Sequence, residues 1–371
     1  MNRIVFVVNN PLFFVSHRLA IGKELIKNGK DVHVVAPGAC PDELLISGLT
    51  YHRLDMSRNG MNPLGELMII YRLWALFRSL KPDLVHLITI KPYLYGGVAA
   101  RLAGVPAVVS AVAGLGILFS RSGLKHTVLR AVLYVLYKLA FGHKNQIAIF
   151  QNTTDRDLLI DWGVLAPKKA VLIKGSGVEL GDYPCCPEPE GIPVVAFASR
   201  LLADKGVFEL AEASRILKKR GVEAKFWLIG EVDEGNSNAV KPEKLAVWAE
   251  EGLIELFGFR RDIATLFAQS NIVALPSYYG EGLPKVLLEA AACGRAVVTT
   301  DHPGCRDAIV AGETGLLVPV KNAAALADAL EQLILDAELR NSMGLSGRAL
   351  AEREFAVQNV VQSHMAIYAS L

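Results

Sequence analysis

Long apolar runs are absent from this sequence, and with them any helix that could cross a membrane, because such a helix needs about 20 consecutive apolar residues. The apolar start of the chain is broken at Asn9, Asn10 and Pro11, and no small-residue cleavage site follows it. We therefore expect this start to be a β-strand rather than a signal peptide.

Cysteines are few and show no pattern. Their spacing does not suit a metal ion, no histidine–cysteine cluster occurs, and their odd number argues against a disulfide framework. We expect reduced thiols in a cytoplasmic protein that holds no metal. The cysteines are Cys40, Cys185, Cys186, Cys293 and Cys305.

Neither sign of charge is in excess, since the formal net charge is only +2. Aromatic residues do not alternate with Lys and Arg along a strand, as they do in RNA-binding sheets. We therefore expect no nucleic-acid partner. With 371 residues, 52% of them hydrophobic and 20% charged, the chain is long enough for two domains with large cores.

Strands and helices alternate along both halves of the chain. Continuous β-branched runs such as 4–8 predict strands buried on both faces, and apolar residues at helical spacing follow them. This order predicts an α/β protein with parallel sheets, whose ligands bind at the carboxyl ends of the strands. The proline-rich stretch 181–193 is the best linker candidate, so we expect domains at 1–180 and 181–354 and a helix at 355–371 that packs back on the first domain. The predicted strands are 4–8, 31–36, 84–88, 107–111, 147–150, 170–173, 194–198, 225–229, 254–257, 272–275 and 296–300, and the predicted helices are 19–26, 64–80, 93–103, 204–220, 263–269, 323–335 and 341–354.

The stretch 276–295 has the pattern of a glycine turn followed by a helix. Pro284 suits the first turn of that helix, where no N–H is needed, and Gly294 suits its end. Glu281 precedes the helix and Glu289 lies in its second turn. A helix start attracts anions, and the two acids would lie along one edge of the turn and helix, which favours a ligand site. The alternative is an ordinary surface loop.

Polar side chains also stand near strand ends in the amino half. The loop 9–14 has no glycine, so an NAD site is not expected there. His17 and Arg18 stand near the start of the first helix, where they could meet an anionic substrate or form a structural pair. We expect His86 and Lys91 just beyond the end of a strand, on the ligand side.

The segment 121–144 combines basic and apolar residues at helical spacing. It is too charged to cross a bilayer, but a helix of this composition can lie among headgroups and be attracted by anionic lipid. The alternative is a helix packed into its own domain with solvated basic ends.

Charged and glycine residues follow successive strands in the second half. Arg200 and Lys205 flank one strand-to-helix turn, Gly230 ends the next strand, and Glu281 and Glu289 mark a third. The carboxyl ends of parallel strands meet at one edge, so these residues should surround one crevice. Two cations suit a diphosphate and a carboxylate can bind sugar hydroxyls, which is the outline of a nucleotide-sugar site.

These motifs together closely resemble the retaining glycosyltransferases of GT-B architecture, often called family 4. The resemblance is carried by S-R-x-x-x-x-K-G at 199–206, Gly230 after L-I-G, G-x-x-x-D at 258–262 and E-G-L-P-K-V-L-L-E at 281–289. The stretch 86–106 is similar to bacterial members that extend undecaprenyl-diphosphate-linked sugars in glycan, O-antigen and capsule assembly. The resemblance covers essentially the whole chain and implies two Rossmann-like parallel-sheet domains facing each other across a cleft.

Carried over residue by residue, the resemblance implies that Arg200 and Lys205 hold the donor diphosphate. Glu289 would bind the ribose hydroxyls and Glu281 those of the transferred sugar. Further donor contacts would be Gly230, the amides of Gly282 and Leu283, and, near the base, Arg261. The acceptor side would include His17, Arg18, His86 and Lys91.

Retention, as the resemblance implies it, requires the acceptor hydroxyl to attack from the face that the nucleotide leaves. The departing diphosphate can accept the proton, and cations with helix amides can stabilise it, so no metal or other cofactor is expected. Many members of the family carry a histidine near 113–116, whereas this chain has none there, which leaves open what assists the acceptor hydroxyl.

We therefore predict an enzyme that moves a sugar, an N-acetylhexosamine by resemblance, from a UDP-sugar to a polyprenyl-diphosphate-linked saccharide. It would act as a peripheral protein on the cytoplasmic face of the inner membrane, attached to anionic lipid through 121–144. A nucleotide-sugar epimerase of the same shape and a non-enzymatic two-domain sugar-binding protein are the alternatives.

Overall fold

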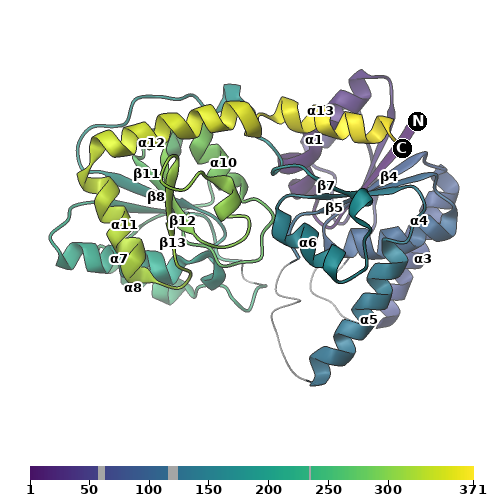
Figure 1. Cartoon of the computed structure of the whole chain (residues 1–371), viewed down its shortest axis with the longest axis horizontal. Helices are drawn as coiled ribbons and strands as arrows, with labels where there is room; N and C mark the ends of the chain where they lie inside the picture. Colours follow the sequence, from purple (N-terminus) through teal and green to yellow (C-terminus); the bar gives the residue numbers. More distant parts are fainter. Residues whose placement is uncertain (57–62, 116–123, 234) are drawn as a thin grey trace. The chain divides into compact units, whose positions relative to one another are not determined.

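The computed structural model of the chain describes residues 1–56, 63–115, 124–233 and 235–371. It contains two compact units, Met1–Ser176 with Gln358–Leu371 (unit 1) and Gly177–Val357 (unit 2). Each is built on one parallel sheet with helices around it (Figure 1), so the predicted α/β class with two Rossmann-like parallel sheets is confirmed. Residues 121–123 of the predicted basic segment and Gly116 lie outside the described residues.

Unit 1 contains a seven-stranded sheet in the order β3-β2-β1-β4-β5-β6-β7, in which every pairing is parallel. Its central strands are continuous apolar runs, and they are buried on both faces as such runs require. The strands are β1 (Arg3–Val8), β2 (Asp31–Ala36), β3 (Thr50–Arg53), β4 (Leu84–Ile88), β5 (Ala107–Val112), β6 (Gln146–Phe150) and β7 (Ala170–Leu172).

Helices cover both faces of this sheet, and alternate residues of one strand pack against different helices. Val5 and Val7 of β1 belong to the core under α3, α4 and α5, whereas Phe6 belongs to the core under α1 and α13. The helices of unit 1 are α1 (Pro11–Lys27), α2 (Asp42–Leu45), α3 (Pro63–Leu80), the π-helix η1 (Pro92–Gly96), α4 (Gly97–Ala103), α5 (Leu124–Ala140), α6 (Thr153–Asp161) and α13 (Val357–Ala369).

Helix α13 comes from the far end of the sequence and completes the core of unit 1. Val360, Ile367 and Tyr368 are buried against residues of β1, α1 and β4. In Figure 1 the yellow α13 accordingly lies beside the purple amino-terminal elements. One face of the first sheet is therefore closed by residues that follow unit 2 in the chain.

Unit 2 contains a six-stranded parallel sheet in the order β10-β9-β8-β11-β12-β13. Helix α7 packs against α11, and α10 packs against α12. The strands are β8 (Val194–Ala198), β9 (Lys225–Ile229), β10 (Glu255–Gly258), β11 (Ile272–Leu275), β12 (Ala296–Thr300) and β13 (Gly315–Val318). The helices are α7 (Val207–Lys219), α8 (Pro242–Glu250), α9 (Ile263–Ala268), α10 (Lys285–Ala292), α11 (Ala323–Leu335) and α12 (Ala337–Leu350).

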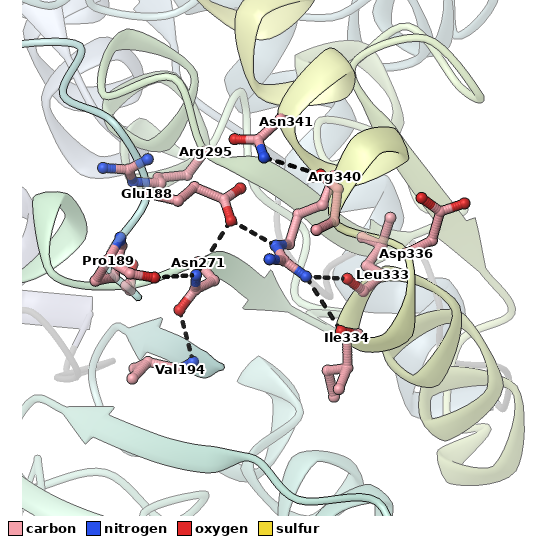
Figure 2. Close-up of polar contacts among 12 residues, drawn as sticks. Glu188, Pro189, Val194, Asn271, Arg295, Leu333, Ile334, Asp336, Arg340 and Asn341 are labelled. Atoms are coloured by element: carbon pink, nitrogen blue, oxygen red, sulfur yellow. Dashed lines mark hydrogen bonds and ion pairs between the residues drawn. The ribbon is translucent and has the colours of Figure 1, made fainter. Parts of the chain in front are cut away.

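The stretch 181–193, interpreted above as a linker, belongs to unit 2 and is fastened to it. Figure 2 shows the Glu188 carboxylate between Arg340 and Asn271. Arg340 Nε donates to Glu188 Oε2 over 2.7 Å, and both side chains are buried. Asn271 Nδ2 donates to the same oxygen over 3.1 Å, while its Oδ1 accepts from the Val194 backbone N–H. The linker interpretation was wrong because proline content reports an irregular backbone and not whether that backbone is packed.

Several short elements were not predicted. Helices α2, α6 and α8 and strand β3 have nine residues or fewer. In α6 only Leu159 is buried, and in α8 only Leu245 and Trp248 are. One or two apolar residues are too few to show a helical or strand period. These elements are therefore set by the residues they pack against, and their own sequence does not predict them.

Candidate active site

Two glycines hold neighbouring turns in close contact at the carboxyl edge of the second sheet. Gly206 has a φ of 83°, and a Cβ atom there would lie 2.3 Å from the Pro276 carbonyl oxygen. Gly230 has a φ of 148°, and a Cβ atom there would lie 1.9 Å from the Ser199 carbonyl oxygen. Only glycine fits either position. The turns after β8, β9 and β11 are thereby packed backbone against backbone, which brings their side chains to one place.

Lys205 and Glu281 form a buried ion pair at this edge. The Nζ atom of Lys205 lies 2.6 Å from Oε1 of Glu281, with side-chain exposures of 8% and 17%. The Ser277 hydroxyl donates to the same Glu281 oxygen over 2.9 Å, and the Tyr279 ring centroid lies 5.2 Å from the Lys205 nitrogen. A lysine after β8 is thus joined directly to a glutamate after β11.

Arg200, five residues before Lys205, has a different partner. Its Nη1 donates to Asp233 Oδ2 over 2.7 Å, and both side chains are partly exposed, at 35% and 26%. Exposed ion pairs contribute little to stability because water solvates each charge alone. An anionic ligand can therefore replace Asp233 at Arg200 at small cost.

Glu289 lies in the second turn of α10, as predicted, and is nearly buried. Its Oε1 accepts from the Tyr183 hydroxyl over 2.8 Å and lies 3.4 Å from Lys285 Nζ, one turn earlier in the helix. Burial raises the pKa of Glu289, although Lys285 and the Tyr183 hydroxyl oppose this shift. The carboxylate is thus held in place by one hydroxyl and one ammonium.

The remaining predicted donor residues take up different positions. Gly282 and Leu283 are buried in the turn that leads into α10. The N–H of Gly230 donates to the Gly258 carbonyl over 2.8 Å, which joins the ends of β9 and β10. Arg261 is exposed in the loop after β10, a strand that lies two places from β8 in the sheet order.

Two of the residues assigned to the acceptor side are buried in unit 1. His86 is the third residue of β4 and lies within the strand, not beyond its end, which corrects the prediction that it stands on the ligand side. Its Nδ1 lies 2.5 Å from the Tyr368 hydroxyl, and its ring stacks on His364 at 5.6 Å. Arg18 is 2% exposed and donates through Nη1 to the His17 carbonyl. Burial lowers the pKa of Arg18 to about 10 and of His364 to about 3, and holds that of His86 well below its usual value.

The other two residues of that set are nearer the surface. His17 lies in the second turn of α1 and not at its start, because the helix already begins at Pro11. Its ring stacks on Phe13 at 3.9 Å and its Nδ1 lies 2.7 Å from the Ser16 hydroxyl. Lys91 donates to Glu66 Oε1 over 2.6 Å. Arg18 and His86 are therefore brought to one buried cluster, and the structure places Lys91 with α3 instead.

Four polar residues of unit 2 that contact the candidate site were not predicted as site residues. Asp233 lies three residues after Gly230 at the same strand end, and Ser277 follows β11 directly, so strand-end position was a usable signal for both. Asp204 is buried, and its carbonyl accepts from the Tyr278 N–H over 2.9 Å, joining two of the turns. Tyr183 lay in the presumed linker, where no local pattern could mark it.

Within the described residues, no group of three or more His, Cys, Asp or Glu side chains is arranged to hold a metal ion. The pair Asp155 and Asp157 has the spacing of a D-x-D motif, but the Asp155 carboxylate accepts from the Asn152 amide and Asp157 pairs with Arg156. The five cysteines are free. Among the helices of the described part, none combines the length and the apolar character needed to span a bilayer.

Two family models match the chain, one for each half. The model described as glycosyl transferases group 1 matches residues 187–350, and the model described as glycosyl transferase 4-like matches residues 3–152.

Named relatives and a solved structure match nearly the whole length of the chain. The N,N'-diacetylbacillosaminyl-diphospho-undecaprenol alpha-1,3-N-acetylgalactosaminyltransferase of Campylobacter jejuni is 30% identical over 99% of this chain and 98% of its own. The capsular polysaccharide biosynthesis glycosyltransferase CapM of Staphylococcus aureus is 26% identical over 93% and 91%. The crystal structure of Anabaena HepE in complex with UDP has a TM-score of 0.79 at 20% identity and covers 100% of both chains, so it is similar in fold.

Proposed function

The chain belongs to the group 1 family of glycosyl transferases and is a glycosyltransferase, and from this premise we propose that it transfers an N-acetylhexosamine from a UDP-sugar to an undecaprenyl-diphosphate-linked saccharide with retention of configuration. The name of the Campylobacter relative supports the class of acceptor and of sugar, because that protein matches along nearly its whole length. The capsular relative supports a place in polysaccharide assembly.

The observation that carries the proposal is the Lys205–Glu281 pair beside Arg200 at one edge of the second sheet. A UDP-sugar has two features that such a site would recognise, a diphosphate with negative charge and a hexose with several hydroxyls. Arginine and lysine bind phosphate oxygens, and a carboxylate accepts hydrogen bonds from hydroxyls. The site offers both kinds of group within one buried contact.

In the proposed complex, Arg200 exchanges Asp233 for the donor diphosphate and Lys205 turns its remaining N–H groups to the same oxygens. Glu281 accepts from the transferred sugar, and the Gly282 and Leu283 amides face the leaving group. Glu289 binds the ribose, while Gly230 gives the backbone close approach to the nucleotide and Arg261 lies toward the base.

The proposed step proceeds on one face of the sugar. The acceptor hydroxyl oxygen forms a bond to the anomeric carbon while the bond from that carbon to the β-phosphate oxygen breaks. The hydroxyl proton passes to the departing phosphate, so UDP leaves with both bonding electrons. Negative charge accumulates on the diphosphate, which is where Arg200 and Lys205 act. We propose that these cations suffice, and that turnover survives chelation of divalent metals.

The acceptor side is proposed for unit 1, with His17, Arg18, His86 and Lys91 as its candidate residues. Arg18 of α1 and His86 of β4 are buried, and His86 is bonded to Tyr368 of α13, so the proposed role of the two residues is to position the carboxyl edge of the sheet. A lipid-linked acceptor would be met at the cytoplasmic face of the inner membrane, to which the basic segment 121–144 would attach the enzyme peripherally.

The test is a donor panel with a defined acceptor. The protein is incubated with UDP-sugars and an undecaprenyl-diphosphate-linked saccharide, with and without a chelator, and UDP release and the anomeric configuration of the product are measured. We expect turnover with at least one UDP-N-acetylhexosamine and an axial product from an axial donor. The variants Glu281→Gln and Arg200→Ala should lose at least about a hundredfold in rate. Wild-type rates in both variants, or no turnover over the whole panel, would refute the proposal.

A further inference from the structure

Exposed apolar side chains of unit 1 are concentrated on one layer of helices. Four of them form a stripe on α3 at helical spacing, which we call the α3 stripe. Leu64 and Leu67 are 77% and 63% exposed, and Met68 and Tyr71 are 48% and 59% exposed. Residues at i, i+3, i+4 and i+7 lie on one side of a helix, so these four form a continuous apolar surface facing outward.

The adjoining helices of the same layer continue this apolar surface. Helix α3 packs on α4, and α4 packs on α5. Leu102 of α4 and Val135 and Leu139 of α5 are also exposed, at 65%, 56% and 45%. Isolated exposed apolar residues are ordinary, but a stripe with neighbours across three packed helices marks an interaction surface.

The charges of this layer have one sign. The sequences of α3, α4 and α5 contain a single acidic residue, Glu66, and it is bound to Lys91 with only 17% of its side chain exposed. The exposed charges described on the three helices are cations, namely Arg72, Arg78, Arg101 and Lys138. Helices of unit 2 differ, since α7 and α11 present acids that pair with Arg215 and Arg220.

Aromatic residues stand where this apolar surface meets the cations. Tyr71 lies against Trp74 with ring centroids 5.7 Å apart, and Lys138 lies 5.8 Å from the Tyr134 ring centroid. Amphipathic rings and long basic side chains are the residues that settle at the level of lipid headgroups. The combination of apolar stripe, cations and rings is that of an interfacial helix.

We propose that the outer face of α3, led by the α3 stripe, docks on a lipid surface containing anionic headgroups. This rests on the proposed function and assigns to α3 a contact that the segment 121–144 was expected to make alone. A second copy of the chain is the less suitable occupant, because a two-fold contact would bring Arg72 and Arg78 against cations of the same face.

The position of the α3 stripe relates this docking surface to the sheet. The contact between Lys91, which follows β4, and Glu66 places the first half of α3 beside the carboxyl edge of the first sheet. Ligands of open parallel sheets bind at that edge. Docking through the α3 stripe would therefore hold this edge next to the lipid surface from which a lipid-linked acceptor must come.

The test measures binding of the full chain to vesicles without donor or acceptor. Vesicles of phosphatidylglycerol and phosphatidylcholine in equal parts are compared with vesicles of phosphatidylcholine alone. We expect the wild type to bind the anionic vesicles and to be released by high salt. The double variant Leu67→Gln/Tyr71→Gln should lower the partition coefficient by on the order of tenfold or more. The variant Arg72→Gln/Arg78→Gln should lower it roughly tenfold on anionic vesicles only.

The matched control is Leu45→Gln/Ile46→Gln, which removes two apolar residues of unit 1 at the end of α2, 61% and 84% exposed, and should leave binding unchanged. Equal losses in the control and stripe variants, or no loss in the stripe variant, would overturn the proposal. A wild type that is dimeric without vesicles, and monomeric in the stripe variant, would overturn it in favour of a subunit contact. A stripe variant that melts well below the wild type would show that these residues are packed and would also overturn it.

The outcome is separable from the proposed function. Sugar transfer to a short-chain, detergent-dispersed acceptor does not need a vesicle, so it should persist in the stripe variant. Transfer without vesicle binding would refute the docking surface alone, whereas vesicle binding without transfer to any acceptor would refute the proposed reaction alone.

Discussion

Burial separates the two cations of the candidate site. The side chains of Lys205 and Glu281 are both largely withdrawn from water, whereas those of Arg200 and Asp233 stay 35% and 26% exposed. A buried charge that loses its partner keeps its desolvation cost, but an exposed one is solvated again by water. We therefore expect Lys205 to stay with Glu281 during a catalytic cycle and Arg200 to exchange partners.

Replacing Lys205 by methionine tests this difference. The substitution keeps the apolar stem but leaves Glu281 buried without its cation, so the free energy of unfolding of unit 2 should fall by about 3 kcal/mol. Arg200→Met is the matched control, and its loss should stay below about 1 kcal/mol because Asp233 reaches water. Unfolding in urea, with hydrogen exchange of the β11 amides as the readout, measures the loss of free energy in both variants. Equal losses in the two variants would contradict the assignment.

The raised pKa of Glu289 predicts a pH dependence with a definite sign. Burial disfavours the charged carboxylate, so the folded chain loses stability as pH rises through the raised pKa. Glu289→Gln removes the charge and with it this cost. The melting temperature of the variant, relative to the wild type, should therefore rise between about pH 4 and pH 8. A difference that falls over this range would show that Lys285 and Tyr183 outweigh burial.

At the scale of elements, the irregular segment before β8 does more than connect the units. Its Tyr183 hydroxyl donates to Glu289, and Arg348 of α12 holds the Tyr183 carbonyl and the Ala292 carbonyl at the end of α10. Further along, Glu188 is fixed by Arg340 and Asn271 (Figure 2). The segment is thus a strap that positions α10 and its glutamate, built without regular hydrogen bonding.

The strap predicts a positioning role for Tyr183 in donor binding. Tyr183→Phe removes the hydroxyl but keeps the ring, so the Glu289 carboxylate loses one of its two restraints. A hydrogen bond to a charged group contributes about 1.5–3 kcal/mol, so the Kd of UDP should rise about tenfold or more while kcat changes less. Calorimetric titration with UDP and steady-state kinetics separate these effects.

Tyr51→Phe provides the comparison, because the Tyr51 hydroxyl donates to the Ala36 and Pro37 carbonyls within unit 1, whereas Tyr183 and Glu289 belong to unit 2. Its UDP affinity should equal that of the wild type. If Tyr183→Phe were to lower kcat and leave the affinity for UDP unchanged, Glu289 positioning would not be the explanation.

At the scale of the whole molecule, the chain crosses between the units twice. It leaves unit 1 after Ser176, builds unit 2 to Val357, and then supplies α13 to unit 1. Ile367 and Tyr368 complete a core that begins with β1. The core of unit 1 is therefore built from two segments that are separated in the sequence by all of unit 2.

A core substitution in α13 should therefore destabilise the unit that is distant from it in sequence. Ile367→Ala creates a cavity against β1, α1 and β4 and should cost about 2–4 kcal/mol. Hydrogen exchange should quicken in β1 and α1 and stay unchanged in β8 and β11. Faster exchange confined to unit 2 would contradict the assignment of α13 to the first core.

Much of the fold could be predicted because its signals are local. The central strands are continuous apolar runs, and every strand predicted from such a run is present, from 4–8 to 296–300. The glycine turns and the start of α10 after Pro284 were predicted from residues whose backbone preferences are strong. The short helices α6 and α8 were missed because their few apolar residues do not form a period.

The candidate site was only partly predictable. Sequence order with strand-end logic placed Lys205 and Glu281 at one edge, and they are in contact. The same reasoning put His86 beyond a strand end, but His86 lies inside β4. That α13 covers His86 could not be predicted, because nothing near a histidine in the sequence shows which helix will pack on it. The roles of Lys205, Glu281 and His86 in binding and catalysis remain predictions.

The sequence by itself thus determined the alternation of strands and helices, the glycine turns and the family, since each depends on neighbouring residues or on short motifs. Only the tertiary structure decided that Asp233 holds Arg200, that Tyr183 holds Glu289 and that Tyr368 covers His86. These partners are separated by 33, 106 and 282 positions. The physical reason is that hydrogen bonds and burial act through space over a few ångströms, whereas a sequence pattern reports only what lies within a turn or a strand.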